Sequence, residues 1–403
     1  MKLVPKRRFR GFSGEWQCCL FKDLLDQSDG IRRGPFGSAL KKECFVENSD
    51  FVVYEQQNAI YDNYETRYNI TEEKYYELSR FKVSAGDFIM SGAGTIGRIS
   101  RVPKGIKPGV INQALIRLKT DTGRIDSDYF LQWMRSARMQ NRLTDANPAS
   151  AMVNLVPMSD VKNWGVSAPS LLEQQKMGRF FSKVDNLITI QHIKLKKLQA
   201  IKQAYLHEMF PAEGESVPKR RFEGFTGEWK IQELGEIAQI TMGQSPSSNN
   251  YTNNPSDHIL VQGNLDMKNN RVCPRIWTKQ VTKKANKGDI ILTVRAPVGD
   301  VGKTDYDVVL GRGVAGIKGN EFLFQLLIKL KINDFWSNLS TGSTFDSINS
   351  DDIRTTEVLI PSIEEQQKIG SFFRKLDERI ALQQAKINKL KAMKQAYLHE
   401  MFV

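Results

Sequence analysis

The stretch PSLLEQQKMGRFFSKVDNLITIQHIKLKKLQAIKQAYLHEMF, residues 169–210, returns near the end of the chain as PSIEEQQKIGSFFRKLDERIALQQAKINKLKAMKQAYLHEMF, residues 361–402. In both copies apolar residues recur three, four or seven positions apart, with Lys, Gln and Glu between them, which is typical of one apolar face of a helix. From Glu173 to Phe210 such a helix would be roughly 57 Å long at about 1.5 Å per residue. The apolar positions are Met177, Phe181, Val184, Ile188, Leu195, Leu198, Tyr205 and Met209 in the first copy and Ile369, Phe373, Leu376, Ile380, Ile387, Leu390, Tyr397 and Met401 in the second.

Two copies of one long amphipathic helix most simply pack against each other. Gln191 and Gln383 stand where the pattern expects an apolar residue, and polar residues at such positions can set the register of a helix pair. The alternative is that each helix lies separately on the surface of its own domain.

A second repeat precedes each long helix. VPKRRFRGFSGEW begins at Val4 and VPKRRFEGFTGEW begins at Val217, with 11 of 13 positions identical. A period near 200 residues is too long for a solenoid, so the chain is predicted to be a tandem duplication of one module. The expected segments are a first module (1–168), a first long helix (169–210), a hinge of sequence PAEGES (211–216), a second module (217–360) and a second long helix (361–403). In each module we call the repeated opening segment the head and the divergent remainder, about 17–168 and 230–360, the middle.

The two middles share a pattern but few residues. Runs rich in β-branched residues predict strands, and longer runs with helical spacing predict helices late in each middle. Strands followed by one late helix indicate a mixed α+β fold for each module. The predicted strands include FVVYEQQNAIY (51–61), INQALIRLK (111–119), DIILTV (289–294) and VVLGRGVAGI (308–317), and the predicted helices are SDYFLQWMRSARMQNRL (127–143) and EFLFQLLIKLKINDFW (321–336).

Composition and charge suggest the class of partner. The 403 residues carry a net charge of +13 and 40% are apolar, so the chain can bury real cores and favours a polyanionic partner. Nucleic acid is the first candidate, an anionic membrane surface is the second, and a basic protein without either partner is the alternative. Four cysteines without metal-ligand spacing, together with the lack of a signal peptide or an apolar span, predict a soluble, cytoplasmic protein.

Two glycine motifs resemble cofactor sites. GAGTIG (92–97) matches the GxGxxG pattern, but the following RISRVPKGIKPG cannot form the helix whose N-terminus would hold a cofactor. A glycine-rich loop that approaches a ligand is therefore favoured, and the same stretch of the second module, VRAPVG, lacks the pattern. DVGKT (300–304) is no P-loop because Pro297 replaces its first glycine. With four His and no HExxH or serine elbow, the sequence predicts no catalytic and no metal site.

Several strings together resemble the specificity subunit of type I restriction–modification systems, and the resemblance covers essentially the whole chain. The strings are PSLLEQQKMGRFFSKVD and PSIEEQQKIGSFFRKLD, GEW ahead of each middle, RRGPFGSALKK, MSGAGTIGRISR, TMGQSP and GDIILTVRAPVGD. The resemblance implies two target-recognition domains in pseudo-two-fold repeat, each reading one half of a split DNA sequence. It also implies that the two long helices form an antiparallel coiled coil that acts as the spacer.

The resemblance further implies which partners do the chemistry. Two methyltransferase subunits, which hold S-adenosylmethionine, would methylate adenine at N6 in each half-site. Motor–nuclease subunits, which use ATP and Mg²⁺, would join them for restriction of double-stranded DNA. This chain would be non-catalytic and would bind no cofactor itself.

Candidate DNA contacts can be chosen by side-chain chemistry, because Arg, Asn and Gln can make paired hydrogen bonds to guanine or adenine. We expect DNA-binding residues in the first module at Arg32, Arg33, Ser38, Lys41, Lys42, Gln57, Asn58, Ser91, Thr95, Arg98, Asn112 and Gln113, and in the second at Gln244, Ser245, Ser247, Gln262, Asn264, Arg295 and Arg312. The alternative for each is a turn-capping role or a phosphate contact.

Equivalent docking surfaces for two copies of one partner would explain why the segment at Val4 is repeated at Val217. The expected docking residues are Arg7, Arg8, Phe9 and Trp16, with their copies Arg220, Arg221, Phe222 and Trp229. The aromatic members are equally consistent with core residues that tie each head to its helix.

Three other functions fit parts of the sequence. A free-standing DNA-binding regulator would need no repeated surface for an enzyme partner. An enzyme with a site in the 92–97 loop would need Gly94 for cofactor binding. A structural coiled-coil adaptor does not explain the Gln- and Arg-rich loops of the middles.

Overall fold

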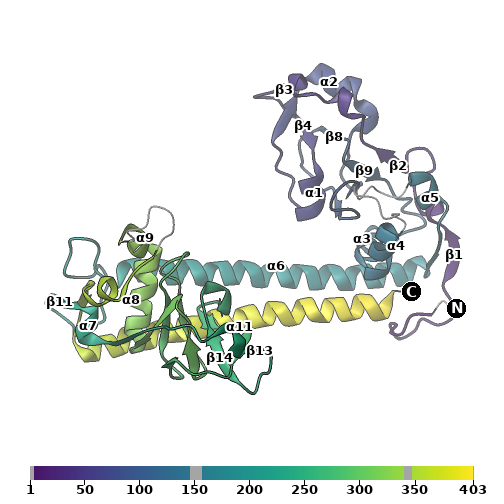
Figure 1. Cartoon of the computed structure of the whole chain (residues 1–403). Helices are drawn as coiled ribbons and strands as arrows, with labels where there is room; N and C mark the ends of the chain where they lie inside the picture. Colours follow the sequence, from purple (N-terminus) through teal and green to yellow (C-terminus); the bar gives the residue numbers. More distant parts are fainter. Residues whose placement is uncertain (1–3, 146–156, 340–346, 403) are drawn as a thin grey trace. The chain divides into compact units, whose positions relative to one another are not determined.

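The computed structural model describes residues 4–145, 157–339 and 347–402 (Figure 1). The chain forms two compact units: unit 1 consists of residues 1–192 and 386–403, and unit 2 of residues 193–385. Each unit contains one head, one middle and segments of both long helices. The division between the units therefore falls inside the long helices and not at the ends of the predicted segments.

The two long helices are α6 (Leu171–Glu208) and α11 (Ile363–Met401). Most of their predicted apolar positions are buried, among them Phe181 and Phe373, and so is the polar Gln191. This burial matches the predicted seam with one polar residue within it.

Contacts within each unit give the direction of the helix pair. In unit 1 the rings of Phe180 and Tyr397 lie 5.3 Å apart, and Lys394 Nζ lies 2.7 Å from an Asp185 carboxylate oxygen. In these pairs the residue number rises along α6 while the partner's residue number falls along α11, so the two segments run antiparallel. In unit 2 the corresponding pairs are Tyr205 with Phe372 at 4.9 Å and Lys202 with Asp377 at 2.6 Å. The predicted antiparallel pairing is confirmed in both units.

Within its described residues, the middle of unit 1 contains two four-stranded sheets and a separate strand pair. Its strands are β1 (Gln17–Leu20), β2 (Ile31–Arg33), β3 (Phe45–Val46), β4 (Phe51–Tyr54), β5 (Tyr68–Ile70), β6 (Phe88–Ser91), β7 (Ile99–Arg101), β8 (Gly109–Ile111), β9 (Leu115–Leu118) and β10 (Gly165–Ala168). Its helices are α1 (Gln56–Tyr61), α2 (Glu72–Glu77), α3 (Ser127–Arg135), α4 (Ala137–Asp145) and α5 (Met158–Lys162). The strand orders are β2-β9-β6-β7 and β3-β5-β4-β8, and β1 pairs antiparallel with β10.

Unit 2 repeats this plan with additional strands. Its strands are β11 (Lys230–Glu233), β12 (Gln239–Met242), β13 (Tyr251–Thr252), β14 (His258–Val261), β15 (Met267–Lys268), β16 (Arg271–Val272), β17 (Ile276–Thr278), β18 (Lys283–Ala285), β19 (Ile290–Thr293), β20 (Val301–Lys303), β21 (Val308–Leu310), β22 (Val314–Lys318) and β23 (Glu357–Ile360). Its shorter helices are α7 (Leu234–Ile237), α8 (Glu321–Ile332), α9 (Phe335–Leu339) and α10 (Ser350–Arg354). The sheet order β12-β22-β19-β20 corresponds to β2-β9-β6-β7, and β11 pairs with β23 as β1 does with β10. The predicted α+β duplication is confirmed.

Local capping changes some of the predicted elements. The stretch 51–61 is a strand only to Tyr54, because the Asn58 side chain accepts the Glu55 N–H at 2.6 Å and starts α1. The predicted helix 127–143 divides at Ser136, which is extended and whose hydroxyl accepts the Met139 N–H. The stretch 111–119 is likewise interrupted by a turn between β8 and β9.

The predicted helix 321–336 also divides. Helix α8 ends at Ile332 and α9 begins at Phe335. Between them Asp334 adopts a left-handed φ of 54°, which ends an α-helix.

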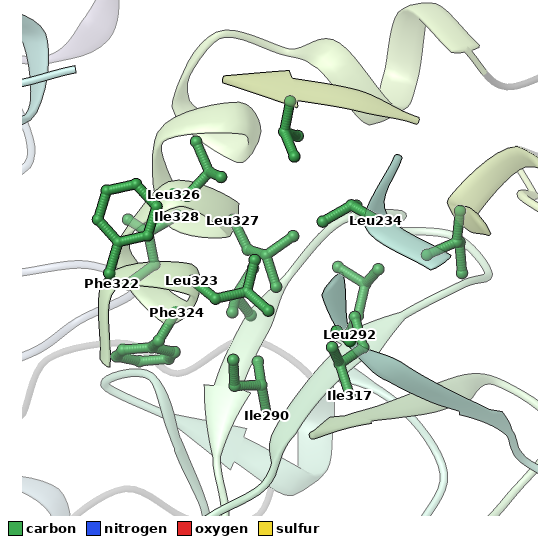
Figure 2. Packing of buried hydrophobic residues seen from close by; sticks show 14 of the residues in the cluster. Leu234, Ile290, Leu292, Ile317, Phe322, Leu323, Phe324, Leu326, Leu327 and Ile328 are labelled. Atoms are coloured by element: carbon green, nitrogen blue, oxygen red, sulfur yellow. The ribbon is translucent and has the colours of Figure 1, made fainter. Parts of the chain in front are cut away.

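Each core draws on the head, the middle and both long helices. In unit 2, Leu234, Ile290, Leu292 and Ile317 face the apolar side of α8, and Figure 2 shows this packing. Phe210, two residues after α6, and Phe373 of α11 belong to the same core. In unit 1, Phe181 of α6 and Phe402 near the α11 end pack with Trp16 of the head and Tyr129 of α3. Burying each such aromatic contributes about 1.5–3 kcal/mol, so the repeated strings are needed to complete both cores. None of the helices in the described part of the chain is both long enough and apolar enough to span a bilayer.

Candidate nucleic-acid interface

Four loops meet at one edge of the unit 1 sheets. Backbone and side-chain bonds connect them: Gly92 N donates to the Ala114 carbonyl at 2.7 Å, the Gln56 amide donates to the Ala93 carbonyl, and Gly34 N donates to the Leu115 carbonyl at 2.9 Å. The four are the loops 34–38, 92–98 and 112–114 and the connection from β4 into the first turn of α1, residues 55–58; we refer to all four as loops. Together they make one continuous surface from segments that are far apart in the sequence.

Unit 2 brings the equivalent loops together. Val294 N donates to the Gly313 carbonyl at 2.9 Å, and Arg312 N donates to the Ser245 hydroxyl at 3.1 Å. Gly311 N donates to the carbonyl of Val261, directly before the second loop. The loops are 243–247, 262–266, 294–300 and 311–313. We call each set of four loops the recognition edge of its unit.

A buried hydroxyl holds the same hairpin tip in both recognition edges. Thr293 Oγ1 accepts the Asp300 N–H at 2.8 Å and donates to the Pro297 carbonyl at 2.8 Å. Ser91 Oγ likewise accepts the Arg98 N–H at 2.9 Å and donates to the Thr95 carbonyl. The tips thus share a backbone scaffold and differ in their exposed side chains.

The 92–97 motif therefore sits in a hairpin between β6 and β7, as its sequence context predicts, and β7 rather than a helix comes directly after it. Ser91 itself is fully buried, so its predicted DNA contact is replaced by a role in shaping the tip.

The structure brings most predicted DNA-binding residues of unit 1 to its recognition edge or beside it. Asn58 is an exception, because it is buried and donates to the carbonyls of Asn63 and Glu65 at 2.7 and 2.9 Å. Lys41 and Lys42 come after the first loop at the start of a short 3₁₀ turn, and both are exposed. The other exposed members are Arg33, Ser38, Thr95, Arg98 and Gln113, and the half-buried members are Arg32, Gln57 and Asn112.

All seven predicted residues of unit 2 lie on its recognition edge. Gln262 is partly engaged within the unit, since its amide donates to the Tyr251 hydroxyl at 2.8 Å. The exposed members are Gln244, Ser247, Arg295 and Arg312, and the half-buried members are Ser245, Gln262 and Asn264. Their contact with DNA stays a prediction, as it does for the accessible residues of unit 1.

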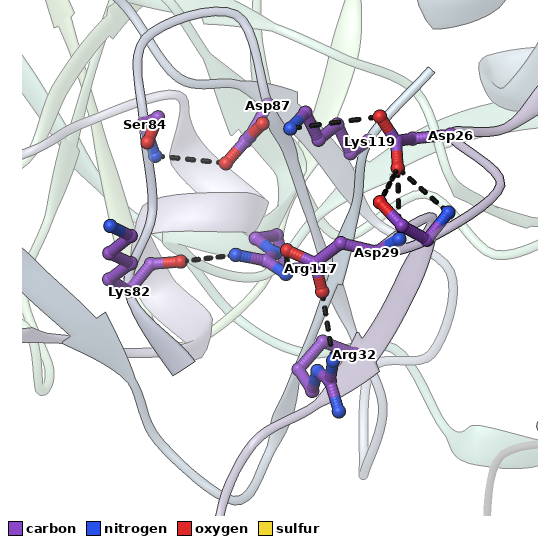
Figure 3. A network of polar contacts seen from close by, with 9 residues as sticks. Asp26, Asp29, Arg32, Lys82, Ser84, Asp87, Arg117 and Lys119 are labelled. Atoms are coloured by element: carbon purple, nitrogen blue, oxygen red, sulfur yellow. Dashed lines mark hydrogen bonds and ion pairs between the residues drawn. The ribbon is translucent and has the colours of Figure 1, made fainter. Parts of the chain in front are cut away.

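An ion network presets the direction of Arg32 (Figure 3). Asp29 accepts a hydrogen bond from Arg32 at 2.9 Å and pairs with Arg117, which lies opposite Arg32 on β9 and is buried. Arg117 also donates to the Lys82 carbonyl at 2.7 Å. Burial acts to raise the pKa of Asp29, but the hydrogen bond from Arg32 and the charge of Arg117 outweigh it and lower that pKa.

Two neighbouring carboxyls of this network differ in environment. Hydrogen bonds from the Ser28 hydroxyl and nearby backbone N–H groups lower the pKa of Asp26 to about 2. Asp87 is buried, and burial raises its pKa. Unit 2 has Thr241 and Gly316 where unit 1 has Arg32 and Arg117, so unit 2 has no arginine pair at these two described positions.

The heads are fastened to the long helices by the predicted docking residues. Arg8 donates two hydrogen bonds of 2.7 Å to the buried Glu173, and Arg221 donates two of 2.7 and 2.8 Å to the buried Glu365. The structure therefore assigns these two arginines to intramolecular bonds.

The other predicted docking residues, which are the aromatic residues and the two remaining arginines, differ in their exposure to solvent. Trp16 and Trp229 are core residues, which is the alternative their sequence left open. Phe9 and Phe222 are half-buried, while Arg7 and Arg220 are exposed. On unit 1, Phe9 also lines a groove of about 470 Å³ together with Phe12, Leu172, Lys176, Arg179 and Phe180.

Residues 36–203 and 226–392 match the family described as the type I restriction modification DNA specificity domain. The chain belongs to this family. The first matched segment contains the unit 1 recognition edge except residues 34 and 35, the second contains the whole unit 2 recognition edge, and each contains most of one long helix. As a specificity subunit with two DNA specificity domains, the chain is a non-catalytic recognition component.

Individual relatives agree with this assignment. The chain is similar to a putative type I restriction enzyme MjaX specificity subunit from Methanocaldococcus jannaschii, with 25% identity over 349 residues, covering 82% of this chain and 80% of the relative. Its fold is similar to the crystal structure of a type I restriction–modification S subunit from M. genitalium, with a TM-score of 0.66, 15% identity and 99% of each chain covered. A further similar structure comes from work described as the structural basis underlying complex assembly and conformational transition of the type I R-M system. It gives a TM-score of 0.58 at 23% identity, covering 96% of this chain and 97% of the other.

Some residues of the recognition edges were missed by reasoning from the sequence. Thr293 could have been found by aligning it with Ser91, and Gln56 directly precedes the predicted Gln57. Phe36 and Leu265 are apolar, so a search for hydrogen-bonding side chains passed over them although both are strongly exposed. Among the described residues no group of three or more His, Cys, Asp or Glu is placed to hold a metal ion.

Proposed function

We propose that each recognition edge reads one half of a split sequence in double-stranded DNA, and that the whole chain thereby directs adenine-N6 methylation and restriction by partner subunits. The observation that carries this proposal is the pair of recognition edges: the same four loops, closed by the same backbone bonds, present different exposed side chains. A common scaffold with different exposed side chains suits two readers of different base sequences.

The chemistry of the exposed groups supports duplex DNA as the ligand. Arg98, Arg295 and Arg312 can donate paired hydrogen bonds to guanine, and Gln113 and Gln244 can pair with adenine in the major groove. Lys41 and Lys42 beside the unit 1 edge suit phosphates, whose contacts position a protein without reading sequence. The net charge of +13 adds sequence-independent affinity through counterion release.

Partner docking is proposed on the repeated surface where each head meets its long helix. On unit 1 this surface is the groove beside Phe9, where Lys176 Nζ lies 5.3 Å from the Phe9 ring centre and 5.4 Å from that of Phe12. Unit 2 repeats it with Lys368 Nζ at 4.9 Å from the Phe225 ring centre. Two equivalent surfaces suit two methyltransferase subunits, which would hold S-adenosylmethionine.

The remaining parts of the proposal concern the full complex. Motor–nuclease subunits would supply ATP- and Mg²⁺-dependent restriction, and this chain would bind no cofactor itself. The cytoplasm, where the chromosome is accessible, is the proposed place of action.

The test is to express the chain with its methyltransferase subunit and to map N6-methyladenine across the host genome. The expected result is one split motif that disappears when this chain is omitted. The double variant Arg295→Ala with Arg312→Ala should relax recognition in one half of the motif only. The matched control Arg271→Ala removes an exposed arginine on β16, outside the recognition edge, and should leave the motif intact.

No new methylation by a soluble, DNA-binding complex would refute the proposal and favour a free-standing DNA-binding regulator. Relaxed recognition in both halves would refute the assignment of one half to each unit.

A further inference from the structure

Phe36 is the most exposed large apolar side chain among the described residues. Its exposed fraction is 90%, although burying an aromatic ring of this size normally stabilises the folded protein. Single exposed apolar residues are common on protein surfaces, so exposure alone decides nothing. What distinguishes Phe36 is its place on the recognition edge.

The chain on both sides of Phe36 carries exposed polar and basic residues. Arg33 lies before it in the chain and Ser38, Lys41 and Lys42 lie after it, and all four are exposed. An exposed ring flanked in the chain by exposed cations, on a surface proposed to bind DNA, suits a polyanion with stacked rings.

The turn that carries Phe36 is held by the neighbouring loops. The Phe36 carbonyl accepts the Ala39 N–H at 2.9 Å, which closes a 3₁₀ turn at Gly37–Ala39. Gly34, two residues before Phe36, donates its N–H to the Leu115 carbonyl at 2.9 Å and lies directly against the Asn112 backbone, where a Cβ would clash. The ring is thus presented by a backbone whose position is set before any ligand binds.

Unit 2 presents Leu265 in a comparable way. Its exposed fraction is 71%, and it sits in the 3₁₀ turn Asn264–Asp266 of the recognition edge. The next residue, Asp266, is buried and accepts hydrogen bonds from Gln262 N at 2.7 Å and from Arg275 Nε at 2.9 Å. An exposed apolar side chain therefore stands on a braced turn in both recognition edges.

We propose that Phe36 inserts into the base stack of bound duplex DNA, and that Leu265 does the same in unit 2. Apolar side chains such as Phe and Leu can wedge between base pairs, unstack them and bend the duplex. A local opening of the stack would also lower the cost of removing a nearby adenine from the helix for methylation. This inference rests on the proposed function, because it needs the recognition edges to contact DNA.

The experiment uses the full chain in complex with its methyltransferase subunit and a duplex that carries the mapped motif. The fluorescent base 2-aminopurine is placed at successive positions of each half, avoiding the methylated adenine so that base flipping does not contribute. With wild-type protein we expect fluorescence to rise several-fold at one position in each half. Phe36→Ala should abolish the rise in one half only and weaken binding of the motif about tenfold, and Leu265→Ala should abolish the rise in the other half only.

Two further variants separate insertion from other effects. Phe36→Leu keeps an apolar wedge and should retain most of the fluorescence rise. Tyr61→Ala removes another strongly exposed ring of unit 1, at the end of α1, and should change neither fluorescence nor affinity.

Unchanged fluorescence and affinity for Phe36→Ala, while the wild type still selects its motif, would overturn the wedge and leave the proposed function standing. Loss of the methyltransferase subunit from the Phe36→Ala complex in gel filtration would also overturn it, because Phe36 would then contact protein. If wild-type protein selects no motif, the proposed function itself fails.

Discussion

Replacing Arg8 by Met is predicted to destabilise unit 1 strongly. Arg8 makes two hydrogen bonds of 2.7 Å to Glu173, whose side chain is only 1% exposed. The hydrogen bonds that Arg8 donates to this carboxylate raise the pKa of Arg8, so the guanidinium stays charged at any working pH. Met would fill part of the space but would leave the Glu173 carboxylate buried without its partner.

The magnitude depends on the burial of the pair. Breaking a buried ion pair from one side costs about 3–5 kcal/mol. Arg8 is 14% exposed, so water can partly replace its charge, and we expect a loss near the lower limit, about 3 kcal/mol. Such a loss speeds the exchange of core amides by roughly 100-fold, since about 1.4 kcal/mol is a factor of ten.

Hydrogen–deuterium exchange of peptides from α3 and the first turns of α6 measures this opening. Arg7→Met is the matched control, because Arg7 is 55% exposed and pairs with Glu400 on the surface, where such pairs contribute about 0–1 kcal/mol. The double variant Arg8→Met with Glu173→Met should recover most of the protection, because it leaves no buried charge. The reasoning is refuted if Arg8→Met exchanges no faster than Arg7→Met, or if the double variant is as unstable as the single one.

Two other changes have expected outcomes. Gly178→Ala should destabilise unit 1 by about 1–2 kcal/mol in urea unfolding, because the new Cβ would lie 2.5 Å from an Asp126 carboxylate oxygen and 2.8 Å from Tyr129 N. The control Gly165→Ala, whose Cβ would have no heavy atom within 4 Å, should be close to neutral, and equal effects of the two variants would contradict the packing argument. Burial raises the pKa of Asp87 above its unfolded value, so this carboxyl favours the folded state only when protonated and opposes it as pH rises through the folded pKa. Asp87→Asn should therefore be more stable than wild type at pH 7, and the difference in unfolding free energy should shrink as pH falls toward 4. A variant less stable than wild type at pH 7 would show that attraction to Arg117 outweighs burial.

Several features could be predicted because they depend on local pattern. The repeated helices, the second head and the GxGxxG hairpin each carry their signal within a few turns or a few residues, through periodicity or through the residues directly after the motif. The errors are also local: Asn58 caps a helix where β-branched neighbours suggested a continuous strand, and Ser136 starts a new helix inside an apparently continuous one. In both cases a single side-chain hydrogen bond outweighed the propensity of the flanking residues.

The candidate site was predicted in part. Polar residues of the right chemistry, such as Gln244 and Arg312, could be picked from the sequence, but nothing local indicates that their loops meet. Burial could not be predicted either: Ser91 and Asn58 have the same hydrogen-bonding groups as exposed residues, and only the packed chain shows that those groups are used internally. Arg8 and Arg221 face the same limit, because their partners Glu173 and Glu365 lie 165 and 144 residues away.

By itself, then, the sequence determined the duplication, the two long amphipathic helices, the α+β class and the family, since these rest on repeated strings and on apolar spacing along one chain. Only the tertiary structure decided that each compact unit is completed by the helix end of the other repeat, that four loops form each recognition edge, and that Phe36 and Leu265 stand exposed on them. These features depend on contacts between distant segments and on which side chains lose their water, and neither is encoded in any short stretch of residues.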